Sequence, residues 1–191
     1  MPNIGLYFGS FNPIHTGHLL VATHIKEAAK FDEVWFVVSP QNPFKEKNEL
    51  SAEQHRVNMV KLATENISYF KTETIELQLP QPSYTHRTLA ELVTLYPQHQ
   101  FSIIIGEDNV AKLNEWKEIE WIKKHFYIIV YNRNNNSETI RNQQSILKYY
   151  QLPKIDISST EIRKRIQDNK PIKYFVPDVV EQYIAFHKLY S

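Results

Sequence analysis

Two kinds of hydrophobic pattern alternate along the chain. Short and nearly continuous apolar runs predict five strands, at residues 4–8, 33–39, 71–77, 101–105 and 127–131. Runs of this kind are typical of strands that are buried on both faces of a parallel sheet. A short sixth strand is predicted at residues 154–157.

Helical patterns separate these strands. Val21, Ala22 and Ile25 share one face of a helix predicted at residues 17–30. Further helices are predicted at residues 51–66, opened by a capping box at Ser51, at residues 85–95, and after Pro177.

The alternation of strands and helices predicts an α/β fold with a doubly wound, Rossmann-like and mainly parallel sheet. Its crossover connections should be right-handed. Neither an internal repeat nor a linker is evident. We therefore expect residues 1–191 to form a single domain with a small helical part at the C-terminal end.

Composition narrows the classes of partner. The 191 residues carry 22 Lys and Arg against 21 Asp and Glu, so a nucleic-acid partner gains no support. No apolar run approaches the roughly 20 residues of a membrane span. Cysteine is absent, which excludes thiolate chemistry, and no signal peptide is evident. We expect a cytoplasmic protein without a membrane partner; the sequence leaves the oligomeric state open.

The strongest chemical signal follows the first strand, in the segment GSFNPIHTGH at residues 9–18. The start of a helix offers unpaired N–H groups and a partial positive charge to an anion. His15 and His18 flank Gly17, and His18 is in phase with the apolar face of the helix. One histidine near a helix start is more often a cap or a packing residue. Two histidines around a glycine in this turn favour a phosphate site.

A second signal, ISSTEIR, lies at residues 157–163. Ser158 and Glu161 have the spacing of a capping box, so a helix should begin here. Backbone donors, two further hydroxyls and the Arg163 guanidinium would suit a pyrophosphate. If this segment stood alone, an ordinary capped surface helix would be the favoured interpretation.

The two segments together resemble known motifs. His15 to His18 is similar to the H-x-G-H signature of the nucleotidylyltransferase superfamily. The wider turn resembles the G-G-[ST]-F-[DN]-P-x-H-x-G-H pattern of bacterial nicotinate-nucleotide adenylyltransferases, with Phe8 replacing the first glycine and Asn12 where aspartate is common. ISSTEIR is similar to the I-S-S-T-x-I-R motif near the C-terminus of the same family.

The resemblance implies which residues bind ATP. His15, His18 and Arg163 would be the catalytic residues. Residues 105–116 resemble the family's I-G-x-D-x-x-x-x-L-x-x-W segment, which adds two further positions. The implied ATP site comprises Gly9, Ser10, Phe11, His15, His18, Gly106, Asp108, Ile157, Ser158, Ser159, Thr160 and Arg163.

The acceptor site is also implied by resemblance. SYTHRTL at residues 83–89 is similar to the family's S-Y-T-x-x-T-L helix start, where backbone N–H groups receive a pyridine carboxylate. Two further loops resemble the P-x-x-P-H-K and R-P-G segments, with Phe44 replacing the histidine and asparagines following the arginine. The implied acceptor residues are Lys45, Tyr84, Thr85, Trp116 and Arg133.

The resemblance implies an enzyme that transfers the adenylyl group of ATP to nicotinate mononucleotide in NAD biosynthesis. Mg²⁺ would be bound mainly through ATP phosphates and water, with no protein metal site. Alternative acceptors are nicotinamide mononucleotide, phosphopantetheine and another phosphorylated alcohol. A core similar to class I aminoacyl-tRNA synthetases and a non-catalytic adenine-nucleotide sensor remain further alternatives.

Overall fold

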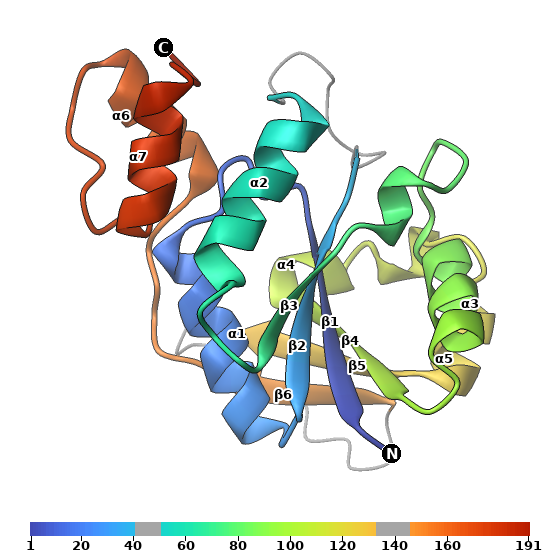
Figure 1. The fold of residues 1–191 in the computed structure, drawn as a ribbon. Coiled ribbons are helices and arrows are strands. Elements are labelled where there is room, and N and C mark those ends of the chain that lie inside the picture. The colour runs from blue at the N-terminus through green and yellow to red at the C-terminus, as the bar shows by residue number, and fades with distance from the viewer. Residues whose placement is uncertain (41–50, 133–145) are drawn as a thin grey trace.

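The computed structural model describes residues 1–40, 51–132 and 146–191. Six parallel strands form one sheet in the order β3-β2-β1-β4-β5-β6, as Figure 1 shows. The strands are β1 (Asn3–Gly9), β2 (Glu33–Val38), β3 (Phe70–Glu73), β4 (Gln100–Gly106), β5 (Tyr127–Asn132) and β6 (Leu147–Gln151). The predicted Rossmann-like sheet is thereby confirmed.

Helices cover both faces of the sheet (Figure 1). The longer ones are α1 (Thr16–Ala28), α2 (Glu53–Thr64), α3 (Thr85–Leu95), α6 (Ser159–Gln167) and α7 (Asp178–Phe186). Shorter elements are α4 (Glu107–Val110), α5 (Ile119–His125), η2 (Ile75–Leu77) and η3 (Leu113–Glu115). The sequence patterns did not predict α4 or α5.

Each face of the sheet buries its own apolar cluster. Phe36 and Val38 of β2 pack with α1 and α2 on one face, whereas Trp35 and Val37 pack with α3 and α5 on the other. This alternation follows from the two-residue period of a strand. Strand order reverses between β1 and β4, so the loops after these strands diverge toward opposite faces. A crevice at such a switch point is where open α/β sheets bind ligands.

Three details of the predicted elements are wrong. The sixth strand is Leu147–Gln151, not residues 154–157. The third strand ends at Glu73, because that side chain accepts hydrogen bonds from the N–H groups of Thr74 and Ile75 and turns the chain into η2. Helix α2 has Ala52 as its N-cap, without a side-chain capping bond, so the predicted capping box does not form. The hydroxyl of Ser51 is bonded elsewhere.

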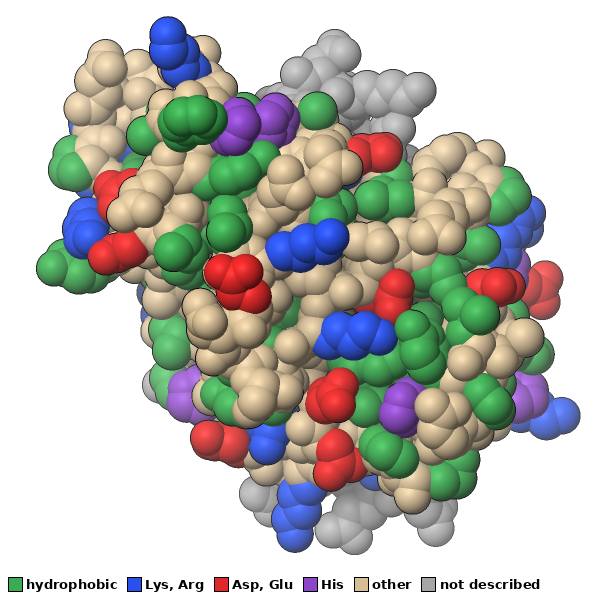
Figure 2. Space-filling model, in the orientation of Figure 1, with side chains coloured by type: hydrophobic (Ala, Val, Ile, Leu, Met, Phe, Trp, Pro, Cys, Tyr) green, Lys and Arg blue, Asp and Glu red, His purple; other side chains and the backbone are tan. Residues whose placement is uncertain are grey.

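Charges of both signs are interspersed on the face of the molecule that Figure 2 shows. No broad basic patch is visible on that face, in keeping with the near balance of the sequence. Among the described residues, no helix combines the length and hydropathy needed to cross a membrane.

Candidate nucleotide site at the carboxyl edge of the sheet

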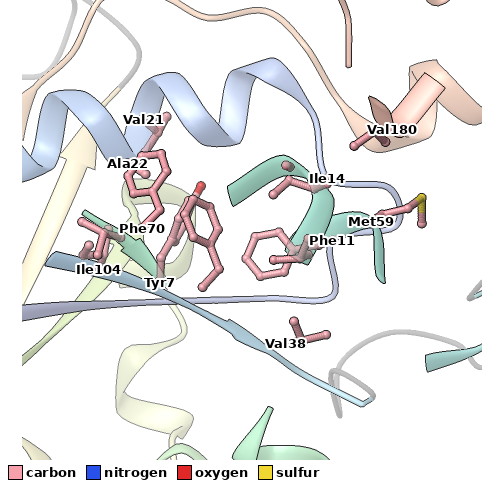
Figure 3. Close-up of a cluster of buried hydrophobic side chains, with 14 of the residues drawn as sticks. Tyr7, Phe11, Ile14, Val21, Ala22, Val38, Met59, Phe70, Ile104 and Val180 are labelled. Carbon is pink, nitrogen blue, oxygen red and sulfur yellow. The ribbon is translucent and has the colours of Figure 1, made fainter. Parts of the chain in front are cut away.

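Apolar side chains of the turn between β1 and α1 anchor it to the core. Phe11 and Ile14 point into the cluster around Tyr7, as Figure 3 shows, and Phe11 is 2% exposed. Its backbone is left-handed, with φ of 46°. The side chain of Phe11 is therefore part of the core, while its backbone forms part of the turn.

His15 and His18 cap the start of α1 reciprocally. The N–H of His18 donates to Nδ1 of His15, and the N–H of His15 donates to Nδ1 of His18, each at 3.3 Å. The two rings are stacked, with centroids 3.6 Å apart. Because each Nδ1 is an acceptor, the proton of a neutral ring belongs on Nε2. Both imidazoles therefore have Nε2–H as their ring donor.

The space beside this pair is narrow. A Cβ added at Gly17 would lie 3.0 Å from Nδ1 of His15 and 3.1 Å from Cγ2 of Ile155. A side chain at this position would therefore need the His15 ring or Ile155 to shift by a few tenths of an ångström. The ring of His18 meets the edges of Tyr7 and Phe11, which places it on the inner face of α1.

Residues 157–163 lie directly against this turn. Ser158 caps α6 by accepting from the N–H of Glu161 at 3.1 Å, as its spacing predicts. The hydroxyl of Ser159 donates to the carbonyl of Pro13 at 2.9 Å, and Nη1 of Arg163 donates to the carbonyl of Asn12 at 3.0 Å. Two motifs about 150 residues apart in the chain therefore form one unit with two helix starts.

The remaining residues of the implied ATP site lie near Arg163 and at the end of β4. Nη2 of Arg163 approaches the hydroxyl of Thr160 at 3.5 Å, and Ile157 packs at the edge of the core. Gly106 is the N-cap of α4, and a Cβ there would overlap a carboxylate oxygen of Asp108. Asp108 itself is exposed at the carboxyl end of β4.

A second cluster of candidate residues surrounds the start of α3. Tyr84 is the N-cap of this helix, yet its side chain makes no capping hydrogen bond. Arg87 and Lys117 lie over the Tyr84 ring, at 5.3 Å and 4.8 Å from its centroid. Because Lys117 contacts Tyr84, its neighbour Trp116 also lies near the start of α3. Trp116 is half-buried against the core.

Electrostatics at the start of α3 favour an anion. Desolvation by burial lowers the pKa of His86, and the positive charge of Arg87 lowers it further. The positive charge of Lys117 acts in the same direction, whereas the negative charge of Glu118 raises the pKa. The helix dipole adds a partial positive charge at this helix start. Two of the five predicted acceptor residues, Lys45 and Arg133, lie outside the described residues. Tyr84, Thr85 and Trp116 are the three that the structure places.

A buried arginine that sequence patterns did not identify lies next to the β1–α1 turn. Arg56 of α2 is 0% exposed. It donates to the carbonyls of Ser10 at 2.6 Å, Ser39 at 2.7 Å, Pro40 at 2.8 Å and Ser51 at 3.3 Å. Desolvation lowers its pKa from the usual value. Arg56 therefore joins the loop after β1 to the chain that follows β2.

A buried carboxyl group, that of Glu76, joins two segments near the start of α3. Glu76 is 3% exposed and accepts a hydrogen bond from the hydroxyl of Thr88 at 2.8 Å. Burial raises the pKa of Glu76, opposed by hydrogen bonds from hydroxyl groups. The contact ties η2 to the first turns of α3. An apolar residue would have been expected at position 76 from its burial alone.

The fold and the paired helix starts define a class of nucleotidyltransferase. The chain belongs to the cytidylyltransferase-like family, whose model matches residues 6–165.

Curated relatives narrow the comparison. A probable nicotinate-nucleotide adenylyltransferase of Cytophaga hutchinsonii is 44% identical over 188 residues, covering 98% of both chains. One from Flavobacterium psychrophilum is 44% identical with the same coverage. Among solved structures, the nicotinic acid mononucleotide adenylyltransferase of Plasmodium falciparum complexed with NaAD has a TM-score of 0.79 at 26% identity. It covers 100% of this chain, which covers 98% of it.

Proposed function

We propose that this enzyme transfers the adenylyl group of ATP to nicotinate mononucleotide, giving nicotinate adenine dinucleotide and pyrophosphate in NAD biosynthesis. The names of the relatives support the substrate pair. The observation that carries the chemistry is the hydrogen-bonded union of the His15–His18 turn with the start of α6. That union collects donors from two helix starts around one anionic position.

The reaction is an in-line displacement at phosphorus. A phosphate oxygen of the acceptor forms a bond to the α-phosphorus of ATP, while the bond from that phosphorus to the bridging oxygen breaks and pyrophosphate leaves. The nucleophile is already an anion, so no general base is required. The enzyme must hold two anions together and stabilise charge at the transition state.

The donors are assigned as follows. His15 and His18 direct Nε2–H toward the triphosphate, and the backbone capping of both rings selects the tautomer that can donate. Arg163, Ser158, Ser159 and Thr160 bind the leaving pyrophosphate. Gly9, Ser10, the backbone of Phe11 and Ile157 line the ATP site, with Gly106 and Asp108 at the nucleoside hydroxyls.

Mg²⁺ fits this scheme as an ion carried by the substrate. Within residues 1–40, 51–132 and 146–191, no cluster of three or more His, Asp or Glu could hold a metal. The site's own donors are imidazole, hydroxyl and guanidinium groups, whereas Mg²⁺ prefers carboxylate, phosphate and water oxygens. Bound through ATP phosphates and water, it would neutralise charge on the triphosphate.

The acceptor is assigned to the start of α3. The pyridine carboxylate of the acceptor would accept hydrogen bonds from backbone N–H groups at this helix start. The nearby positive charges of Arg87 and Lys117 would favour binding of the carboxylate. Trp116 would stack on the pyridine ring. Lys45 and Arg133 are proposed for the acceptor phosphate from sequence resemblance alone. Residues 1–191 would act as one catalytic domain, in the cytoplasm, where ATP is available.

The test compares acceptors. Purified protein is mixed with ATP and Mg²⁺, and pyrophosphate release is measured with nicotinate mononucleotide and with nicotinamide mononucleotide. A strong preference for the acid is expected. Preference for the amide would overturn the acceptor assignment and keep the mechanism. Release with neither would direct the assay to phosphopantetheine and other phosphorylated acceptors. Amino-acid-dependent adenylate formation, or tight ATP binding without turnover, would overturn the proposal.

A further inference from the structure

The C-terminal tail reaches back to the loop that carries the catalytic histidines. Tyr190 is the second-to-last residue of the chain, and its hydroxyl donates to Oδ1 of Asn12 at 2.8 Å. The same hydroxyl lies 3.1 Å from the hydroxyl of Ser51. A contact that spans 178 positions of sequence is costly to close unless the folded structure fixes both ends.

Asn12 is the point where several segments converge. Its Oδ1 also accepts from the N–H and the hydroxyl of Ser51, at 3.2 Å and 3.1 Å. Its backbone carbonyl accepts from Nη1 of Arg163 at 3.0 Å. Asn12 therefore holds the start of α2, the C-terminal tail and the guanidinium of α6 in one arrangement. His15 follows three residues later.

The environment of the Tyr190 hydroxyl keeps it protonated, so that it remains a hydrogen-bond donor. Burial raises the pKa of Tyr190 to about 12, although the positive charges of Arg163 and Arg56 oppose this. The phenol therefore keeps its proton throughout the working range of pH. The residue has a left-handed backbone, with φ of 67°, and its ring packs at the edge of the core. Removal of the hydroxyl alone would leave that packing in place.

We propose that Tyr190 is a positioning residue for adenylyl transfer: its hydroxyl fixes the side chain of Asn12, and thereby holds the loop of His15 against Arg163. It does not touch the substrates. The role rests on the proposed function for its kinetic consequence, whereas the tether itself is a property of the protein without substrate. The two parts can be measured separately.

Tyr190→Phe is the main variant, and Tyr183→Phe is its matched control. Tyr183 lies on α7, in the same C-terminal part, and its hydroxyl bonds with His55 and Asn58 of α2, each at 2.9 Å. Both substitutions remove one hydroxyl from a packed ring. Only the first removes a bond to the β1–α1 turn.

Hydrogen exchange of the full-length protein without substrate tests the tether. Tyr190→Phe should speed exchange of the amides at residues 9–15 by about five- to tenfold, since one hydrogen bond is lost, while amides in β5 stay unchanged. Tyr183→Phe should leave residues 9–15 unchanged. Equal exchange in wild type and Tyr190→Phe would overturn the proposal, whether or not the protein is active.

Kinetics test the consequence. Tyr190→Phe should lower kcat about fivefold and leave the KM of nicotinate mononucleotide unchanged, because only the ATP half is displaced. Ser51→Ala should act in the same direction, and the double variant should fall short of the product of the single effects, because both bonds end on Asn12. A loss of melting temperature without any change in kcat would reduce Tyr190 to a structural residue and overturn the positioning role.

Discussion

The two halves of the candidate site are built differently. On the ATP side, the start of α1 is capped by a reciprocal histidine pair and the start of α6 by Ser158, and hydrogen bonds from Ser159 and Arg163 join the two. On the acceptor side, Tyr84 offers α3 no side-chain cap. Trp116 and Thr85 remain half-exposed.

The difference separates two physical tasks. Transition-state stabilisation needs donors whose positions are fixed before the reaction. Contacts within the protein fix the donors that are proposed for the ATP side. Recognition of the acceptor needs a helix start whose N–H groups receive the ligand itself. A side-chain cap at Tyr84 would compete with that ligand. We therefore expect substitutions on the ATP side to change kcat and those on the acceptor side to change KM.

His18→Ala should give the largest effect. It removes a donor from the transition state and one half of the reciprocal cap, so kcat should fall about 100-fold or more while the KM of ATP rises less. His24→Ala on the same helix is the control and should keep full activity. Steady-state pyrophosphate release measures both. A rise in KM with unchanged kcat would assign His18 to binding alone.

Trp116→Ala should give an intermediate effect confined to the acceptor. Loss of stacking should raise the KM of nicotinate mononucleotide roughly tenfold and leave the KM of ATP unchanged. Trp121→Ala is the control, since Trp121 is another half-buried tryptophan, and its ring packs on His125 of α5 and on Phe126, which follows the helix. If the KM of ATP rose as much as that of the acceptor, the proposed division between the halves would be wrong.

Glu76→Gln should give the smallest effect, on stability. The folded pKa of Glu76 is raised by burial, so the folded state holds its proton more tightly than the unfolded chain. Wild-type stability should therefore fall as pH rises from the unfolded pKa to the folded pKa. The glutamine variant lacks this loss, and its melting temperature should exceed that of wild type by about 2 to 4 °C above that window.

Thermal unfolding at several pH values checks this prediction. At acid pH, where Glu76 is protonated in both states, the two melting temperatures should converge. A constant difference across all pH values would mean that the substitution acts through packing or hydrogen bonding with Thr88 rather than through ionisation.

The sequence predicted the sheet and most of the helices because their apolar periods are strong. Thr85–Leu95 was predicted at its observed bounds. The failures have local causes: Glu73 turns its strand with its own carboxylate, and Ser51 bonds to Asn12 instead of capping α2. β6 has partly exposed residues and lies at the sheet edge, where the apolar period is weak.

Predictions for the site depended on motifs rather than on periodicity. The two ATP motifs could be paired because each lies at a helix start. The roles of Arg56 and Tyr190 were not predicted, because most of their hydrogen-bond partners are backbone or side-chain oxygens that lie far away in the sequence. In the sequence, the available sign for Arg56 was an arginine beside the apolar positions Val57 and Val60 of a predicted helix.

Arg56 also has a consequence for protein engineering. One guanidinium binds the carbonyls of Ser39 and Pro40 on one side of residues 41–50, and the carbonyl of Ser51 on the other. The entry and exit of that segment are thus anchored by a residue that is not part of it. A change in the length or sequence of the segment between these anchors should therefore leave the end of β2 and the start of α2 in place.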